Sequence, residues 1–280
     1  MTADLVKAIA YVQDHGSVIE RARLAAILQD ELPSKTALRE LARLQNPDGG
    51  FAYWVPQASN LCDTAYVLQW FDDLKVHKGP VVERACRFIL DRQQKDGGWD
   101  EVAAVVNHDP PEWMMPGRIE TRVWLTGFCA HVLICFGHAE APGTYCPTDF
   151  LLEHRDEQGR LAGYPIATWV ALPMLHFYPG PDPETFDRAR AVAEADYASQ
   201  YDSAMLAWML RCLKDADLPF DHPLVARALD DLERQQRPDG SWPAAEGEQR
   251  AVEVTVAALR ELKRYGRIGQ GSNRTGACGG

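Results

Sequence analysis

The sequence predicts an all-α protein built from repeated helical hairpins, and three observations lead to this fold class. A short motif recurs where helix-forming segments end, amphipathic helices alternate with uncharged ones, and no run of alternating β-branched residues indicates a strand. The 280 residues are 46% hydrophobic, which is enough to bury a large core. We therefore expect a single domain over residues 1–265 and a flexible, glycine-rich tail over 266–280.

The recurring motif reads glutamine, two other residues, aspartate, glycine, one more residue and an aromatic ring. Its copies are Gln45/Asp48/Gly49/Phe51, Gln93/Asp96/Gly97/Trp99 and Gln236/Asp239/Gly240/Trp242, with a degenerate copy at Arg155, Gly159 and Leu161. The glycine provides the left-handed backbone that ends a helix, and the aspartate can hydrogen-bond the amides of a turn. The glutamine amide can tie two backbone groups together. Corners that recur in this way are typical of stacked helical pairs.

The segments around these corners form six pairs of predicted helices. The first helix of a pair is amphipathic and spans 3–14, 35–45, 80–94, 147–154, 184–196 or 221–236. The second helix carries fewer charges and spans 18–31, 61–75, 119–137, 164–177, 201–214 or 248–265. An amphipathic helix has one solvated face, whereas an uncharged helix is buried on all sides. The first helix of each pair should therefore lie outside the second.

The corner motif resembles the QW motif of squalene cyclases, and residues 35–265 resemble the prenyltransferase and squalene-cyclase superfamily as a whole. The resemblance implies a terpenoid cyclase-like α/α toroid of six hairpins. Its inner and outer helical rings would surround an apolar central cavity that holds an isoprenoid. In that family the glutamine and the aromatic ring stack and brace the outer helices. The resemblance therefore favours a structural role for Gln45, Gln93 and Gln236.

Acidic residues stand in the first turns of the predicted inner helices. In a ring, these helices begin at one mouth, where their N-termini favour an anion such as a diphosphate. These acidic residues are Asp63, Glu120 and Asp202. Either all of them cap their helices, or one of them is a neutral carboxylic acid that protonates an alkene. Class II terpene cyclases carry the acid motif DxDD, and the matching positions here read Asn60-Leu61-Cys62-Asp63. Only the last acid is kept, and Cys62 stands where the family has its proton donor. The candidate catalytic residues are thus Asp63, Cys62, Glu120 and Asp202.

Aromatic residues on the inner helices are the candidates for contact with an isoprenoid, because aromatic faces stabilise carbocations. They are Tyr66, Trp70, Trp124, Phe128, Trp169 and Trp208. The alternative interpretation is that these rings only pack in the core. The proline-rich loop 106–118 carries Trp113 and has the length of a lid. Arg118 and Arg122 beside it are the candidates for binding an anionic headgroup.

The metal-binding patterns are incomplete. Protein prenyltransferase β subunits hold zinc with an aspartate, a cysteine two residues later and a histidine. This chain keeps Cys62 and lacks that aspartate, although Asp63 and His131 could supply ligands. The acidic runs at 72–76 and 230–234 fit solvated helix faces better than the DDxxD magnesium motif. We therefore expect no bound metal and no cofactor.

Charge and composition limit the partners and the location. The net charge of -11 argues against nucleic acid. The N-terminus lacks the apolar core of a signal peptide, and the uncharged stretch 123–136 is too short to span a bilayer. Membrane association would thus be peripheral at most. Seven cysteines without a CxxC pair indicate reduced thiols, which favours a cytoplasmic location.

The predicted function is that of a terpene cyclase-like enzyme. It would bind a prenyl-bearing small molecule and close rings after protonating it. Three alternatives stay open. The first is a non-catalytic protein that binds an isoprenoid or another protein, and the second is a prenyltransferase β-subunit-like protein. The third is an α/α-barrel sugar enzyme, which needs a carboxylate pair across its cavity.

Overall fold

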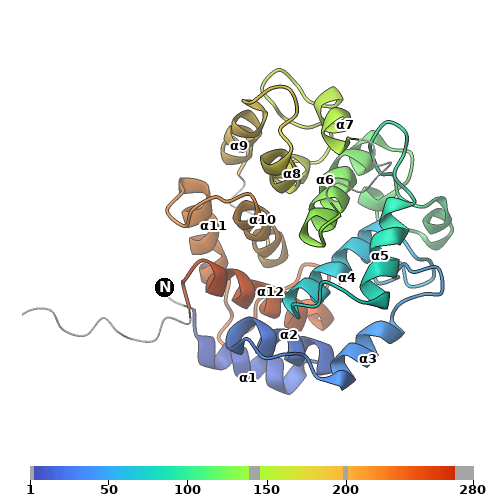
Figure 1. Ribbon diagram of the computed structural model, residues 1–280. Coiled ribbons are helices and arrows are strands. Elements are labelled where there is room, and N and C mark those ends of the chain that lie inside the picture. Colours follow the sequence, from blue (N-terminus) through green and yellow to red (C-terminus); the bar gives the residue numbers. More distant parts are fainter. Residues whose placement is uncertain (1–2, 139–145, 198–200, 269–280) are drawn as a thin grey trace, which may run out of the picture. The chain divides into compact units, whose positions relative to one another are not determined.

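The computed structural model describes residues 3–138, 146–197 and 201–268, and these residues form an all-α structure (Figure 1). Their twelve α-helices are α1 (Leu5–His15), α2 (Val18–Gln29), α3 (Lys35–Arg43), α4 (Leu61–Asp73), α5 (Pro80–Leu90), α6 (Ile119–Cys135), α7 (Pro147–Glu153), α8 (Ile166–Phe177), α9 (Thr185–Ala195), α10 (Ser203–Asp215), α11 (Pro223–Arg234) and α12 (Ala251–Arg264). Three short 3-10 helices are η1 (Ala103–His108), η2 (Glu112–Met114) and η3 (Glu248–Arg250). Over the described ranges, extended pairing is limited to three isolated bridges at the corners.

Each of the twelve predicted helices is present, and the prediction of an all-α fold is confirmed. The ends differ by a few residues for local reasons. For example, α4 stops at Asp73 because Lys75 takes a left-handed backbone conformation with φ 59°, which a helix does not accommodate. None of the helices in the described ranges is long and apolar enough to cross a membrane.

The chain divides into two compact units. One unit comprises residues 33–199 and 212–219. In it α6 packs between α4 and α8, while the amphipathic helices α5, α7 and α9 pack on α4, α6 and α8 respectively. The side chains of α6 are buried from Val123 to Leu133, as expected for an uncharged helix. These three outer helices therefore each pack mainly on the inner helix that precedes them in sequence, whereas the predicted pairs joined each of them to the inner helix that follows.

The other unit joins the two ends of the chain, because it comprises residues 1–32, 200–211 and 220–280. Here α12 packs against both α1 and α2 (Figure 1). The first residues of the expected tail belong to the described structure. Arg267 pairs with Asp230 of α11 at 3.0 Å, and Ile268 is buried. The remainder of that tail, 269–280, lies outside the described residues.

The corners fasten each outer helix to the next one, which supports the structural role expected for their glutamines. Gln45 Nε2 donates to the carbonyl of Gly49 in its own corner at 2.9 Å and to that of Val81 in α5 at 2.8 Å. Gln236 Nε2 likewise donates to the carbonyls of Gly240 and Asp4, at 3.0 and 3.1 Å. The amide of Gln93 binds the carbonyl of Gly97 at 2.8 Å.

The last residue of each corner, an aromatic residue or Leu161 in the degenerate copy, is bonded to the following inner helix. Its backbone N–H donates to a threonine hydroxyl at 2.9 to 3.1 Å, in the pairs Phe51–Thr64, Trp99–Thr126, Leu161–Thr168 and Trp242–Thr255. The indole N–H groups of Trp99 and Trp242 donate back to carbonyls of the preceding outer helix. The corners at Gln45 and Gln236 are thus hydrogen-bonded joints between three helices, and each corner is bonded to its inner helix through a threonine.

Candidate functional site

The first turn of α4 lies at the centre of the candidate site, and its backbone N–H groups are all bound within the protein. The N–H groups of Leu61 and Cys62 donate to the two carboxylate oxygens of Glu101, at 2.7 and 3.0 Å. The N–H of Asp63 donates to the side-chain oxygen of Asn60 at 2.7 Å, and the N–H of Thr64 donates to the Asn60 carbonyl at 3.1 Å. A helix N-terminus offers an anion only the N–H groups that have no other acceptor. This one therefore has none for a diphosphate.

Asp63 is completely buried and holds the preceding loop against α4. Its Oδ2 accepts hydrogen bonds from the backbone N–H groups of Tyr53 and Trp54, at 2.6 and 3.0 Å, and from the Asn60 amide at 2.5 Å. Its Oδ1 has no hydrogen-bond partner among the described residues. Thr64 does not orient this carboxyl group, because its hydroxyl donates to the Asn60 carbonyl at 2.6 Å. One oxygen of Asp63 is therefore occupied and the other is not.

Three acidic groups meet at this turn, and burial raises the pKa of each. Burial raises the pKa of Glu101 to about 7, against the hydrogen bonds from Leu61, Val102 and Cys62, which lower it. Burial also raises the pKa of Asp63, although its N–H donors oppose this. The pKa of the Cys62 thiol lies well above its ordinary value because of burial and the neighbouring charges of Asp63 and Glu101. Cys62, which aligns in sequence with the proton donor of class II terpene cyclases, is consequently a neutral thiol and a poor acid.

A continuous cluster of aromatic rings adjoins this turn. We call it the aromatic cluster, and it consists of Tyr53, Trp54, Tyr66, Trp70, Trp113, Trp124 and Phe128. Neighbouring ring centroids are 5.1 to 6.2 Å apart, in tilted, stacked and edge-to-face arrangements. Tyr53, Trp54, Tyr66 and Trp113 are half-buried, whereas the other three rings are buried. Four rings of the cluster are thus partly accessible, and they contact one another.

Five of the seven rings in the aromatic cluster are sequence-predicted binding residues, and Trp113 reaches it from the predicted lid. That loop is anchored, because Met114 is fully buried and the Trp124 indole donates to the Trp113 carbonyl at 3.1 Å. Trp169 is buried in α8. Trp208 is half-buried in α10 and belongs to the other compact unit.

The remaining predicted site residues are bound to other groups. Arg118 pairs with Glu112 and Glu120, and all three are half-exposed or exposed. The pKa of Glu120 is lowered by backbone hydrogen bonding and by Arg118, so it is an ionised carboxylate. Asp202 accepts the N–H of Met205 at 2.8 Å and thus caps α10.

Arg122 contributes to a corner. Its guanidinium donates to the carboxylate of Asp96 at 2.7 Å and lies over the ring of Phe150 in α7, 4.7 Å from the ring centroid. The two arginines expected to bind a headgroup therefore both pair with carboxylates of the protein.

Sequence reasoning missed Tyr53, Trp54 and Glu101. The two aromatic residues follow the first corner, outside the helix patterns that were used to select rings. A signal for Glu101 was present in the repeat. It follows the corner ring Trp99 by two residues, where the other corners have Tyr53 and Ala244. An acidic residue at a position where the other repeats have an apolar or aromatic residue is a candidate for a specific role.

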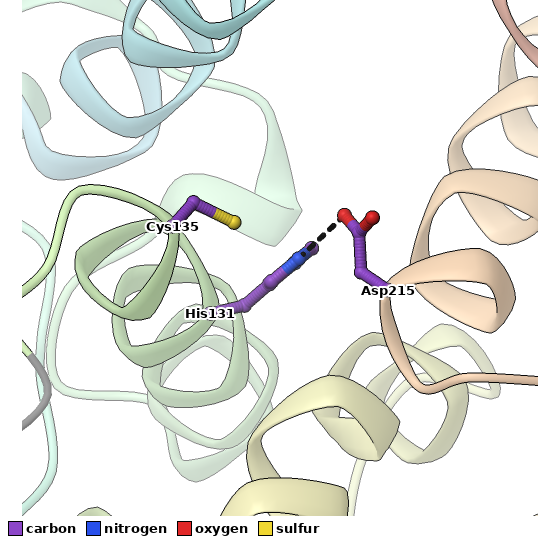
Figure 2. A group of neighbouring side chains, drawn as sticks. All are labelled: His131, Cys135 and Asp215. Carbon is purple, nitrogen blue, oxygen red and sulfur yellow. Dashed lines mark hydrogen bonds and ion pairs between the residues drawn. The ribbon is translucent and has the colours of Figure 1, made fainter.

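A second group of side chains lies at the opposite end of α6 from its first turn. His131 Nε2 and Asp215 Oδ2 are 2.9 Å apart, and Cys135 lies one turn after His131 on α6 (Figure 2). Burial lowers the pKa of His131, but Cys135, Asp215 and Cys212 raise it, and the net pKa lies well above its ordinary value. Over the described ranges, the three-ligand group able to hold a metal is His131, Cys135 and Asp215, so the structure groups His131 with neither Cys62 nor Asp63.

Comparison with solved structures defines the class of fold. A protein from Actinoplanes is 19% identical, with a TM-score of 0.60, over 93% of this chain and 98% of that one. A variant of the type II terpene cyclase MstE from Scytonema, in complex with geranylgeranyl dihydroxybenzoate, is 15% identical with a TM-score of 0.57, over 90% and 88%. The ent-copalyl diphosphate synthase from Streptomyces platensis is 19% identical with a TM-score of 0.55, over 89% of this chain and 50% of that one. The fold is therefore the α/α toroid of the terpenoid cyclases.

The family follows from a sequence profile. The A-macroglobulin TED domain family matches residues 1–143, slightly more than half of the chain, and the chain belongs to this family. None of the curated proteins matches the sequence.

Proposed function

We propose that this protein is terpene cyclase-like in function and binds the hydrocarbon part of a prenyl-bearing small molecule against the aromatic cluster. The observation that carries the proposal is the group of partly accessible rings in that cluster, next to the buried acids Asp63 and Glu101. Aromatic faces bind apolar chains and stabilise a carbocation through the ring quadrupole. The similar MstE structure contains a geranylgeranyl-bearing substrate, which supports a prenyl ligand of that kind.

The geometry favours recognition of the prenyl chain over recognition of a diphosphate. The N–H groups of the first turn of α4 are bound to Glu101 and Asn60, and two carboxylates lie beside them. Arg118 and Arg122 are paired with carboxylates as well. A diphosphate at this turn would meet like charge without free donors. A neutral prenyl alcohol is consequently expected to bind at least as well as its diphosphate.

The proposed chemistry is ring closure started by a proton from the Asp63–Glu101 pair. Glu101, with a pKa of about 7, is partly protonated at neutral pH, as a general acid needs. Asp63 is the first candidate for direct contact, because its Oδ1 has no partner among the described residues. Protonation of an alkene carbon leaves a carbocation, which the neighbouring rings stabilise until a second double bond attacks it. The ring cation then loses a proton from an adjacent carbon to the carboxylate that donated the first proton, so a neutral cyclic product forms and the acid is restored.

A second candidate function is prenyl binding without catalysis. The observation that favours it is the neutral thiol of Cys62 at the position where class II terpene cyclases have their proton donor. In this case Asp63 and Glu101 only fasten the loop and cap α4. The two candidates share the ligand and differ in turnover.

The experiment measures geranylgeraniol binding by tryptophan fluorescence and product formation by mass spectrometry. Trp113→Ala should weaken binding about tenfold, or about 1.4 kcal/mol, the size of one lost aromatic contact. Phe177→Ala, which removes an exposed ring of α8, is the control and should not change it. If Asp63→Asn loses turnover and still binds geranylgeraniol, the result supports the cyclase. Binding without turnover in the unmodified chain selects the non-catalytic candidate, and no binding by geranylgeraniol contradicts both.

A further inference from the structure

We propose that His131, Cys135 and Asp215 form a site for a divalent transition metal ion, with Zn²⁺ as the expected occupant. Sequence analysis predicted no metal, and the two halves of this site are separated by 84 residues between His131 and Asp215. The proposal does not depend on the function proposed above, because the acids and rings of that site are different residues.

The backbone brings two ligand pairs together. His131 and Cys135 are four residues apart on α6, so they share one face of the helix (Figure 2). Cys212 and Asp215 are three residues apart in the last turn of α10. The Cys212 thiol interacts with the His131 imidazole, and Asp215 binds it at 2.9 Å. Each helix therefore presents a nitrogen or sulfur ligand together with a second ligand one turn away.

The spacing of the ligand atoms fits a small ion. The imidazole nitrogen, the Cys135 sulfur and the Asp215 oxygen all lie within 4.8 Å of one another. Zinc binds nitrogen and oxygen at about 2.0–2.2 Å and sulfur at about 2.3 Å, so in a tetrahedral site two ligand atoms are about 3.3–3.7 Å apart. Side-chain rotations that bring the ligand atoms about 1 Å closer would therefore close the site. Cys212 lies beside His131 but outside this three-ligand group.

The kind of ligand and its surroundings indicate which ion binds. A thiolate, an imidazole and a carboxylate together suit zinc and disfavour magnesium and calcium, which prefer oxygen ligands only. His131 is buried and the carboxyl group of Asp215 is 16% exposed, so water is largely excluded. Both helices end at this site, and the C-terminus of a helix carries partial negative charge that favours a cation.

The test uses the full chain, stripped with a chelator and titrated with Co²⁺, whose spectrum reports the ligands. A thiolate ligand gives a sulfur-to-cobalt absorption in the near ultraviolet, and tetrahedral geometry gives visible bands. We expect one equivalent of Co²⁺ to produce both features and Zn²⁺ to displace it. Cys135→Ser should abolish the thiolate absorption or weaken Co²⁺ binding at least tenfold. Asp215→Asn should also weaken it at least tenfold, and it keeps both thiols.

Two controls separate this site from other cysteines. Cys129→Ser changes a buried cysteine on the same helix, and Cys62→Ser changes the cysteine of the first turn of α4. Both variants should bind Co²⁺ as the unmodified chain does. If Cys62→Ser loses the absorption and Cys135→Ser keeps it, the metal binds at α4 and the proposal is wrong. The proposal is also overturned if the unmodified chain shows no thiolate absorption, since His131 and Asp215 are then only an ion pair.

Discussion

At the scale of single residues, Glu101 shows how a buried acid can serve structure and chemistry together. Its two oxygens accept the first N–H groups of α4, which belongs to the preceding helical pair. The same burial that makes these bonds strong raises the pKa of Glu101 to about 7. The residue therefore changes charge near neutral pH, and this change must affect the stability of the fold.

We expect the free energy of unfolding to depend on pH through Glu101. Its pKa is about 7 in the folded chain and about 4.5 in the unfolded one, so the folded state binds the proton more tightly. The stability from this group is complete below pH 4.5 and is lost as the pH rises through 7. Glu101→Gln does not titrate. The stability difference between the unmodified chain and this variant should thus fall by about 2.5 kcal/mol from pH 5 to pH 8.

Urea unfolding at four pH values between 5 and 8 measures this difference. His131 also has a raised pKa, but it titrates in both proteins and cancels in the comparison. The charge of Asp63 raises the pKa of Glu101, so this coupling is part of the measured difference. Glu246→Gln, at an exposed position, is the control and should follow the unmodified chain at every pH. Parallel pH profiles for Glu101→Gln and the unmodified chain would show that Glu101 has an ordinary pKa.

At the scale of elements, the sequence predicts the twelve helices and the corners, and it does so for local reasons. Helix periodicity and the residues of the corner act over fewer than twenty positions, which a repeat makes visible. The candidate site depends on longer distances. Glu101 binds residues 39 and 40 positions earlier, and His131 meets Asp215 across 84 positions. No spacing rule brings such residues together until the helices are packed.

The cost of replacing a corner glycine measures how closely the corner packs on the next outer helix. Gly97 has φ +90°, and a Cβ added there would lie 2.4 Å from the carbonyl oxygen of Cys146, just before α7. Gly117 has a similar φ of +79° but no atom within 4 Å of its added Cβ. Gly97→Ala should cost about 1–2 kcal/mol from backbone strain and more from the clash. Gly117→Ala should cost only the strain.

The difference between the two glycine variants is the measured quantity, in urea unfolding monitored by circular dichroism. Both glycines lie in the same compact unit, so both variants report on the same part of the chain. Equal losses of stability would mean that the close packing of the corner on the next helix contributes nothing, and that only the left-handed backbone matters.

At the scale of the whole molecule, the two ends of the chain fold together. Asp4 exchanges two backbone hydrogen bonds with the amide of Gln236, 232 positions away, at 2.7 and 3.1 Å. Lys263 of α12 donates to the carbonyls of Ile27 and Leu28 at the end of α2. The first helical pair thus completes a unit made mainly by the last helices. The corner at Gln236 binds the residue before α1, just as the corner at Gln45 binds α5.

We therefore expect residues 1–32 to stay bound after the chain is cut behind them. A protease site inserted between Leu32 and Pro33 would be accessible, because Leu32 is 86% exposed. After cleavage, the fragment should co-elute with the remainder in size-exclusion chromatography and separate from it in urea, since α1 and α2 both pack on α12.

Gln236→Ala removes the two hydrogen bonds to Asp4. This loss should weaken binding of the fragment by roughly 1–2 kcal/mol, so that the fragment dissociates faster. Gln249→Ala changes a glutamine that binds Glu246 instead, and should leave dissociation unchanged. If the fragment leaves the cut protein in native buffer, the corner at Gln236 does not hold the chain ends together.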